Sequence, residues 1–477
     1  MKTTFRITAP QFERLDRHLF PGDEDEHGAV ITAGVVETPH ERRFLAREVF
    51  IAKDGVDYVP GKFGYRALTP DFVARVSHHC ARERLAYFAV HCHGGRDSVG
   101  FSETDLKSHQ RGYPALLDIT NGGPVGALVF AANAVAGEIW TPAGVGELDS
   151  MSVIGLNTRR LYPKQPRVPG LPDESFHRQS LMFGAAGQNQ LAQAKVGIIG
   201  LGGVGSLVNE YLARLGAGTI VAVDYDHIED TNRPRVVGSR VADCHSTRGT
   251  GFLGWFKKQR HGPALKVQVA ERVAMKANPK VRFRAIAGDV THQATARELR
   301  DLDFIFLCAD SMQSRLVFNA LVHQYLIPGV QIGSKVPVDN RTGKLGNVFS
   351  AARLVLPQQG GGCLWCNELI PAAMLQAEAL SEAERRQQRY VEDETIAAPS
   401  VITLNALGAA QAANDFLFHY LGLFDHEQAG AGYLLHYSRE RKWRSADCRA
   451  DSACLHCGTT LRSAFARGDK AVLPCKA

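Results

Sequence analysis

The stretch AKVGIIGLGGVGSLVNEYLARLGAGTIVAVDYD, residues 194–226, decides how the second half of this chain folds. The apolar run at 194–200 predicts a buried strand, the spacing of 204–218 predicts a helix, and 219–226 predicts a second strand. A glycine-rich turn joins the first strand to the helix. Strand, tight turn, helix and strand in this order are typical of the first unit of a doubly wound parallel sheet.

The same alternation continues towards the C-terminus. Helical patterns over 264–277 and 291–300 alternate with strand patterns over 281–287 and 303–310. We therefore expect a C-terminal α/β domain of the Rossmann type. The stretch 370–398 is rich in Ala, Glu, Arg and Gln, and it predicts an exposed helix with a loop.

Composition limits the classes of protein to which the chain can belong. Its 477 residues predict two to four domains, with two large ones as the simplest count. Lys and Arg exceed Asp and Glu by 55 − 49 = 6, a mild excess that does not indicate nucleic-acid binding. The sequence has no apolar run of 18 residues and no signal-peptide pattern, so we expect a cytoplasmic protein with reduced thiols.

A proline-rich stretch, LYPKQPRVPGLPDES, marks the boundary between two domains. Its prolines recur at every third position, the period of a polyproline II spacer: Pro163, Pro166, Pro169 and Pro172. An irregular loop is the alternative. We predict a first domain over 1–155, a linker over 156–172 and a second domain over 173–477. The first has strand patterns at 28–36, 42–52 and 85–93 and a helix at 69–84, which predicts an α+β fold.

The glycine-rich turn predicts a phosphate-binding site. Glycines between a strand and a helix let phosphates approach the helix N-terminus, and the turn consists of Gly200, Gly202, Gly203, Gly205 and Ser206. Asp224 ends the second strand, where a ribose-binding carboxylate belongs. These features alone fit a nicotinamide oxidoreductase equally well.

Four further polar residues favour ATP over a nicotinamide. Asn232, Arg235 and Lys266 follow the second strand, and Asp310 follows a later one. Cations neutralise the charge that develops on pyrophosphate when ATP is split between its α and β phosphates, and a carboxylate can hold Mg²⁺. A dehydrogenase has no need of this series.

These residues resemble the adenylation domain of the ThiF/MoeB/ubiquitin-activating enzyme superfamily, over roughly 173–460. The preceding FHRQSLMFGAAGQNQL, residues 176–191, is similar to the opening signature of that superfamily. The resemblance implies that Asp224 binds the ATP ribose and that Asp226 lies beside it. It also implies that Asn232, Arg235 and Lys266 contact phosphates, and that Asp310 lies at Mg²⁺. Arg178 would reach the partner subunit's site, so the resemblance implies a homodimer.

Two features depart from the superfamily. Val236 follows Arg235 where the family usually has Gln, and an insertion over 240–262 separates Arg235 from Lys266. The insertion is basic and contains Trp255. A partner-binding loop and a solvated insertion are both open interpretations.

Two CxxC pairs, Cys363/Cys366 and Cys454/Cys457, predict a tetrahedral zinc site. Four thiolates leave no open position, so the predicted role is structural. A redox pair is the alternative, and the resembled adenylation domain closes with the same arrangement. The stretch 367–400 contains no cysteine. Cys80 and Cys308 are predicted core residues, whereas Cys244 and Cys475 could accept an acyl group. Adenylation is therefore predicted more firmly than thioester formation.

The first domain contains its own metal motif, HCHGGRDSVGFSETD. His91 and His93 share one side of a strand, and Asp105 can add a third ligand, which leaves a position for water. The pattern resembles the JAB/JAMM (Mov34/MPN) metalloprotease motif. That resemblance implies Glu26 as general base and Ser102 as the oxyanion donor. Eight residues separate His93 from Ser102 where the family has seven.

The alternatives for this motif are two core histidines with a helix-capping Ser102, or an inactive relative of the enzyme. We expect His27 and His109 to be unrelated surface residues.

Both domains point to the C-terminal carboxyl group of a ubiquitin-like protein. The sequence predicts zinc-dependent peptide or isopeptide cleavage fused to ATP- and Mg²⁺-dependent adenylation, in a prokaryotic ubiquitin-like conjugation pathway with a conjugating enzyme. Activation and trimming of a sulfur-carrier protein, with a sulfurtransferase, is the alternative. A non-catalytic scaffold and a nicotinamide oxidoreductase are the remaining hypotheses.

Overall fold

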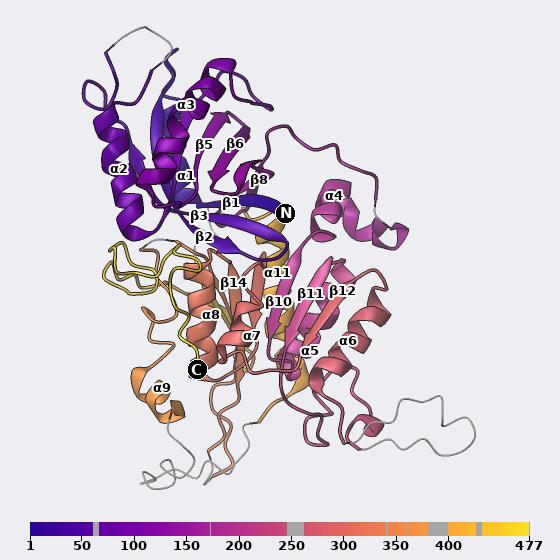
Figure 1. Cartoon of the computed structure of the whole chain (residues 1–477). Coiled ribbons are helices and arrows are strands. Elements are labelled where there is room, and N and C mark those ends of the chain that lie inside the picture. Colours follow the sequence, from indigo (N-terminus) through magenta and orange to yellow (C-terminus); the bar gives the residue numbers. More distant parts are fainter. Residues whose placement is uncertain are drawn as a thin grey trace.

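A computed structural model describes residues 1–60, 66–171, 173–245, 262–339, 342–358, 360–379, 399–425 and 432–476. Two sheets dominate it, one above the other, each with its own helices (Figure 1). We call the nine-stranded sheet with its helices the first domain, and the eight-stranded sheet with its helices the second. Within the described residues no helix is long and apolar enough to cross a membrane.

The first sheet has the strand order β7-β6-β5-β4-β2-β3-β1-β8-β9. Its strands are β1 (Lys2–Thr8), β2 (Gly28–Glu37), β3 (Glu41–Ile51), β4 (Ala86–Cys92), β5 (Val125–Ala131), β6 (Ala134–Thr141), β7 (Gly144–Glu147), β8 (Ser150–Ile154) and β9 (Arg159–Leu161). Helix α1 (Ala9–Leu19) packs on one face through Phe12, Leu15 and Leu19, whereas α2 (Pro70–Glu83) and α3 (Glu103–Ile119) cover the other.

The second sheet has the order β12-β11-β10-β13-β14-β15-β16-β17. Its strands are β10 (Lys195–Ile199), β11 (Thr219–Val223), β12 (Arg282–Ile286), β13 (Phe304–Leu307), β14 (Gly329–Lys335), β15 (Phe349–Val355), β16 (Tyr433–Tyr437) and β17 (Lys442–Ala446). The first five are parallel and the last three pair antiparallel. The predicted two-domain fold with a Rossmann-like second domain is confirmed.

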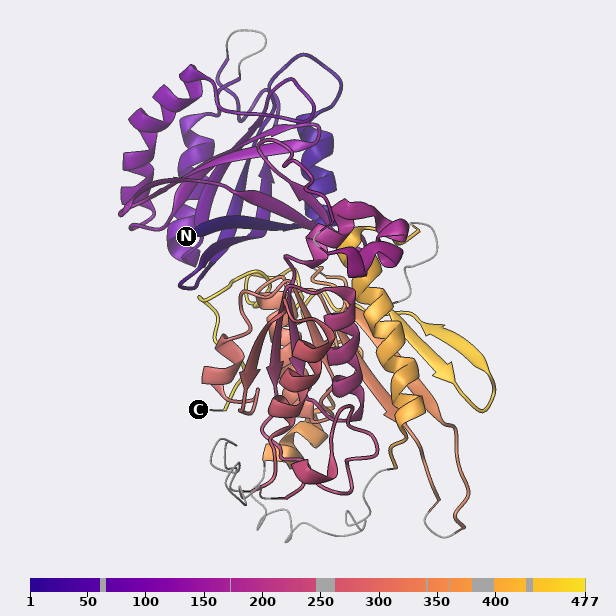
Figure 2. The same cartoon turned by 90° about the vertical axis from the view of Figure 1, so that its right-hand side faces the viewer.

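Helices cover both faces of the second sheet. They are α4 (His177–Leu191), α5 (Gly203–Leu215), α6 (Lys266–Ala277), α7 (Gln293–Arg297), α8 (Met312–Gln324), α9 (Ala372–Ala379) and α11 (Ile402–Leu421). Figure 2 shows α11 running beside α5, and these two helices share one apolar core with α6. Helix α8 belongs to the core of the opposite face.

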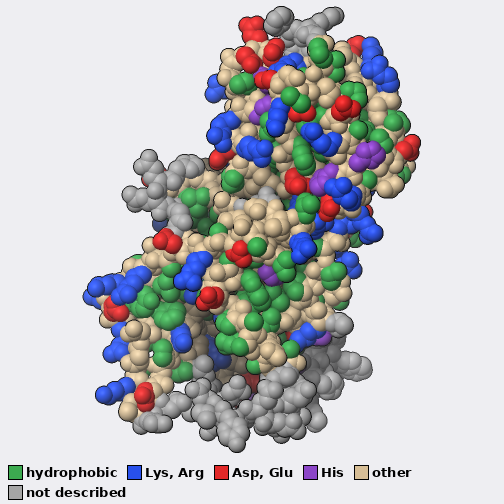
Figure 3. All heavy atoms as spheres, turned by 90° about the vertical axis from the view of Figure 1, so that its left-hand side faces the viewer, with side chains coloured by type: hydrophobic (Ala, Val, Ile, Leu, Met, Phe, Trp, Pro, Cys, Tyr) green, Lys and Arg blue, Asp and Glu red, His purple; other side chains and the backbone are tan. Residues whose placement is uncertain are grey.

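Some predicted segments are shorter than expected or only partly described. The predicted helix at 370–398 is present as α9, and its remainder lies outside the described residues. Most of the insertion at 240–262, including Trp255, also lies outside them, as does Pro172 of the proline-rich stretch. Figure 3 shows basic, acidic and apolar side chains mixed over one face of the molecule, as the small net charge suggests.

Buried arginines join the two domains. The Arg6 guanidinium donates to the Leu326 and Leu302 carbonyls at 2.9 and 3.0 Å and pairs with Asp303 at 3.0 Å. Arg43 donates to the Leu302 carbonyl at 3.1 Å. Because Leu302 precedes β13 and Leu326 precedes β14, the first domain lies on the edge where the parallel strands of the second domain begin.

The C-terminal segment also packs into this junction. Arg47 of β3, fully buried, donates to the carbonyls of Phe465, Thr460 and Leu461 and to the Ser463 hydroxyl. Burial lowers the pKa of Arg47 to about 10, which leaves it charged at neutral pH. The described C-terminal residues are held in place as far as Lys476, whose amide donates to the Thr291 carbonyl at 2.7 Å.

We expect Arg47→Leu to lower the free energy of unfolding by about 3 kcal/mol or more, because buried carbonyls would lose their donors. Arg82→Leu, whose parent side chain is 68% exposed, is the matched control and should change stability by less than about 0.5 kcal/mol. Urea denaturation followed by circular dichroism measures both. Equal midpoints for the two variants would mean that the Arg47 contacts do not hold the domains together.

Candidate active site and metal centres

The glycine-rich turn lies at the carboxyl end of β10, the central strand between β11 and β13. Gly200 has φ +89°, and a Cβ there would lie 2.9 Å from the Ala309 nitrogen. A Cβ on Gly205 would lie 1.8 Å from the Gly200 carbonyl oxygen. Only glycine satisfies both positions, so the turn stays tight and presents the N-terminus of α5 at the edge of the sheet.

Asp224 fixes this turn from the neighbouring strand. Its carboxylate is buried and accepts hydrogen bonds from the Leu201 amide at 2.6 Å and the Asp226 amide at 2.8 Å. Burial raises the Asp224 pKa, against the opposing effects of Lys266 and the two amides. Asp226 is about half exposed, so it is more accessible than Asp224, the predicted ribose ligand.

Lys266 begins α6 and reaches back to the same loop. Its Nζ lies 2.5 Å from an Asp226 carboxylate oxygen, and its amide donates to the Asp226 carbonyl at 2.9 Å. Arg235 passes close to the turn, since a Cβ on Gly203 would lie 3.4 Å from its Cδ. Asn232 is buried and accepts from the Glu229 amide at 3.0 Å, so it shapes the loop that carries Arg235.

Asp310 lies at the same edge, after β13. It is exposed and precedes Ser311, the N-cap of α8. Several acidic groups lie around Tyr225. Burial raises the pKa of Tyr225, and so do the charges of four carboxylates: Asp226, Asp289, Asp224 and Asp310. A cluster of carboxylates beside Lys266 is suited to holding a divalent cation on a polyphosphate.

One contact at the turn was not foreseen in the sequence. Asn405 of α11 packs against the turn, because a Cβ on Gly203 would lie 2.3 Å from its Nδ2. Its position two hundred residues downstream, on an apolar helix, gave no signal in the sequence. Arg178 is exposed on α4, and within the described residues no ion pair or hydrogen bond joins it to the turn.

The four predicted zinc cysteines come together. Sγ–Sγ distances are 3.6 Å for Cys363–Cys366, 3.8 Å for Cys363–Cys454 and 3.6 Å for Cys366–Cys457, and all four atoms lie within 4.8 Å of one another. Hydrogen bonds from Cys363 and Cys457 hold the pKa of Cys454 well below its usual range. Four sulfurs at these spacings are suited to one tetrahedral zinc ion.

His91, His93 and Asp105 form a second group whose ligand atoms lie within 4.8 Å of one another. Asp105 Oδ2 is 3.6 Å from His91 Nε2 and 3.4 Å from His93 Nε2. His91 Nε2 is buried and has no hydrogen-bond partner within the described residues, so His91 is not a satisfied core histidine. Two imidazoles and a carboxylate match a three-ligand zinc site.

Glu26 and Ser102 flank this group differently. Glu26 Oε1 is 3.7 Å from His93 Nε2, in the loop before β2. The Ser102 hydroxyl donates to Asp105 Oδ2 at 2.7 Å and accepts from the Asp105 amide as the N-cap of α3. Burial would raise the Asp105 pKa, but the neighbouring His91 and the hydrogen bonds from Ser102 hold it well below its usual range.

The prediction that His27 and His109 lie on the surface is wrong. His27 is buried and its Nε2 is 2.9 Å from Asp23. His109 is buried beneath the metal-ligand group, where it bonds Glu138 at 2.7 Å and stacks on Tyr113. Helical spacing places His109 on the inner face of α3, a position that the sequence alone did not distinguish.

Neither Cys244 nor Cys475, the two predicted acyl acceptors, is suited to that role. Cys80 is buried as predicted, and Cys308 is partly buried against the core. Cys244 is buried, which does not fit an open acyl acceptor. Burial raises the pKa of Cys475 to about 11, so its thiol stays protonated at neutral pH.

The metal-ligand group of the first domain and the glycine turn of the second domain lie far apart. Gly28 at the outer end of β2 pairs with His91, whereas Val35 near the other end bridges to Gly468 at the domain junction. The glycine turn and Asp310 follow β10 and β13, on the edge of the second sheet that faces away from that junction. At about 3.3 Å per strand residue, the separation is on the order of 30 Å or more.

The ThiF family matches residues 176–456, which is more than half of the chain. The chain therefore belongs to the ThiF family. The sulfur carrier protein ThiS adenylyltransferase of Escherichia coli (strain K12) is 25% identical over 287 residues, covering 59% of this chain and 94% of the relative.

Other similarities are shorter or more distant. The adenylyltransferase and sulfurtransferase uba4 of Emericella nidulans is 32% identical over 167 residues, covering 35% of this chain. The chain spans only 30% of the length of that relative and 28% of the Drosophila virilis adenylyltransferase and sulfurtransferase MOCS3. Among solved structures, E. coli MccB with MccA-N7isoASN matches at TM-score 0.46 and 20% identity, over 61% of this chain and 76% of that one.

Proposed function

We propose that the second domain adenylates the C-terminal carboxylate of a ubiquitin-like or sulfur-carrier protein. One observation carries this proposal: in a ThiF-family domain, Lys266 and Asp310 lie at the same sheet edge as the glycine turn. ATP is the expected co-substrate with Mg²⁺. Membership of the ThiF family favours this reaction over nicotinamide chemistry.

The proposed step is balanced without any further reactant. A carboxylate oxygen of the partner attacks the α-phosphorus of ATP, the bond between that phosphorus and the bridging oxygen breaks, and pyrophosphate leaves. Lys266 and Arg235 would neutralise the charge on the departing pyrophosphate. Asp310 would hold Mg²⁺ against the phosphates, and Asp226 or Asp224 would take the ribose hydroxyls.

Two kinds of partner fit this reaction. Our first candidate is a ubiquitin-like protein that passes to a conjugating enzyme in a prokaryotic conjugation pathway. The second is a sulfur carrier that passes to a sulfurtransferase, and it is supported by the relative whose name gives it a sulfur carrier as its substrate. The described part of 367–400 contains no cysteine, which also favours an acceptor on another protein.

For the first domain we propose zinc-dependent cleavage of peptide or isopeptide bonds at the same C-terminus. His91, His93 and Asp105 would hold the zinc, which supplies Lewis acidity to a water molecule when bound. Glu26 would accept a proton from that water and return it to the leaving amine. Ser102 caps α3 through Asp105, so its hydroxyl would have to leave Asp105 to donate to an oxyanion.

The distance between the metal-ligand group of the first domain and the glycine turn of the second adds a condition to this proposal. A tail shorter than about ten extended residues, held at His91 and His93, would not reach Lys266 while its parent protein stays docked. Cleavage and adenylation are therefore separate binding events, with release in between. The proposal also includes a homodimer in which Arg178 enters the partner's site. Its domain limits are 1–155 and 173–477, and β9 of the segment between them joins the first sheet.

We also propose that the four-cysteine cluster binds one structural zinc. Cys457→Ser is expected to remove one zinc equivalent per chain and to lower the melting temperature, because the metal ties the segment at 454–457 to the sheet. Cys448→Ser, at an exposed cysteine, should change neither quantity. Atomic emission measures the zinc content of both variants, and thermal melts measure their melting temperatures. An unchanged zinc content in Cys457→Ser would exclude the four cysteines as the zinc ligands.

The proposed function is tested by mixing the chain with ATP, Mg²⁺ and partners that carry short C-terminal extensions. Pyrophosphate exchange reports adenylation, and the intact mass of the partner reports cleavage. Exchange without cleavage would leave only the adenylation proposal, and a lack of both would support the scaffold hypothesis.

A further inference from the structure

Part of one edge of strand β3 does not pair with another strand of the sheet. On one side β3 pairs with β2 from Arg42 to Ile51, with one register shift at Thr32/Ala33. On the other side, β1 pairs with it only at Glu41–Leu45, after which the chain of β1 turns into α1. The Gln11 side chain donates to the Ala46 and Arg47 carbonyls, so the unpaired stretch is 48–51 within the described residues.

The register shows which backbone groups face this edge. The Ala52 amide donates to the Gly28 carbonyl at 3.3 Å, so these two residues form a hydrogen-bonded pair. Pairs alternate in an antiparallel ladder, which makes Ile51–Ala29 and Val49–Ile31 non-hydrogen-bonded pairs. The N–H and C=O groups of Val49 and Ile51 therefore point away from β2, towards the open edge.

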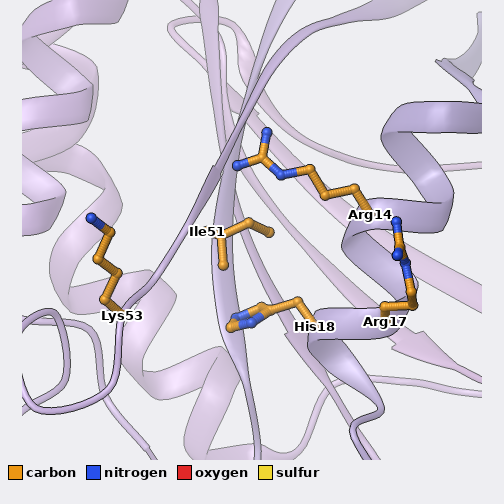
Figure 4. Close-up of a pocket in the computed structure, with 5 residues that line it drawn as sticks. All are labelled: Arg14, Arg17, His18, Ile51 and Lys53. Carbon is orange, nitrogen blue, oxygen red and sulfur yellow. The ribbon is translucent and has the colours of Figure 1, made fainter.

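Cationic side chains surround the edge. A cavity of about 510 Å³ is lined by Arg14, Arg17, His18, Ile51 and Lys53. Figure 4 shows Arg14 reaching from α1 towards Ile51, with Lys53 on the opposite side. Within the described residues no carboxylate lines this cavity, and neither Arg14 nor Lys53 forms an ion pair.

A second cavity of about 470 Å³ shares Arg14, Ile51 and Lys53 and continues along the edge to Arg75 of α2. Its two carboxylates are already paired. Glu48 lies 2.7 Å from His79 Nε2, and Asp57 lies 3.5 Å from Arg75. The two cavities together form an elongated groove of positive charge with unpaired strand groups on its floor.

We infer that this groove, between α1 and α2, docks an extended acidic segment of a partner protein by adding a strand to β3. Backbone groups of Val49 and Ile51 would bond alternate residues of the segment, and Arg14, Arg17 and Lys53 would contact its carboxylates. A small anion would use the charges but not the strand edge. A nucleic acid would use the charges but has no peptide amides to pair.

The site also lies close to the metal-ligand group of the first domain. His18 Nε2 is 2.9 Å from the Gly28 carbonyl oxygen, and its ring packs edge-on against His27, which follows Glu26. A segment held here would place the body of its protein near the end of the sheet that carries Glu26 and His91. The docking itself requires neither catalytic activity.

Binding of a fluorescent seven-residue peptide with alternating Asp and Val tests the inference directly on the full chain. We expect saturable binding that weakens about tenfold for Arg14→Glu and for Lys53→Glu, since each reversal replaces an attraction by a repulsion. The matched control Lys276→Glu, at an exposed residue of α6 in the second domain, should bind as the parent does. Thermal melts of each variant check that it is folded.

Two further peptides separate strand addition from simple charge attraction. A peptide N-methylated at alternate amides should lose binding, and one with Lys in place of Asp should not bind. Equal binding of the N-methylated peptide, or displacement of the acidic peptide by millimolar phosphate or by a single-stranded oligonucleotide, would overturn the inference. So would equal binding to Arg14→Glu and the parent protein.

Discussion

Lys266→Ala is expected to slow ATP–pyrophosphate exchange by roughly 10²–10³-fold, the usual loss when one electrostatic donor at a reacting centre is removed. Lys266 begins α6 at the sheet edge that carries the glycine turn, and only about a tenth of its side chain is exposed. In the free chain its partner is Asp226. A bound triphosphate would offer the same ammonium group a larger negative charge, so we expect the defect mainly in kcat.

Lys276→Ala is the control for this variant, because the residue lies on the same helix ten positions later and is exposed. It should exchange pyrophosphate at the parental rate. If Lys266→Ala kept full exchange activity while remaining folded, the assignment of this edge as the phosphate site would be wrong. Asp226→Asn removes the partner charge of Lys266 but keeps the lysine. It therefore distinguishes loss of the Lys266–Asp226 ion pair from loss of the phosphate contact.

Glu26→Gln is expected to reduce tail cleavage by roughly 10²–10⁴-fold, the usual contribution of a general acid–base group. The amide cannot accept the proton of water, yet it has nearly the shape of the carboxylate. Zinc bound by the first domain should stay at the parental level, because Glu26 lies beside His93 at 3.7 Å and the ligand atoms belong to His91, His93 and Asp105. Pyrophosphate exchange should also be unchanged.

Glu24→Gln is the matched control, an exposed carboxylate in the same loop. It should cleave normally. His93→Ala should instead lose both cleavage and the zinc of the first domain. Cleavage by Glu26→Gln at the parental rate would show that another group accepts the proton, and zinc loss in that variant would make Glu26 a ligand.

The alternation of strands and helices and the glycine spacing were sufficient to predict the second domain. Apolar runs and glycine turns are local signals, and β10, α5 and β11 lie close to their predicted ranges. The spacing within each CxxC pair and within the His-x-His motif is local. That the two CxxC pairs meet across 91 residues was predicted because four thiolates complete one tetrahedral zinc site. Which reactions those clusters catalyse is determined by the proposed experiments.

Features that depend on packing between distant segments were not predictable. Asn405 approaches Gly203 across two hundred residues, and Arg47 binds carbonyls four hundred residues away. His109 was misassigned because the face of α3 that packs on the sheet, which decides whether His109 faces water or Glu138, was not identified from the sequence. The open edge of β3 depends on where β1 stops pairing, which no spacing in the sequence records.

The most direct test of the central claim compares two forms of one partner, the first with a free C-terminal carboxylate and the second with a C-terminal amide. With ATP and Mg²⁺, we predict pyrophosphate exchange for the free carboxylate and none for the amide, because only the carboxylate can attack the α-phosphorus. Equal exchange with both forms of an otherwise active partner would contradict adenylation of the C-terminus.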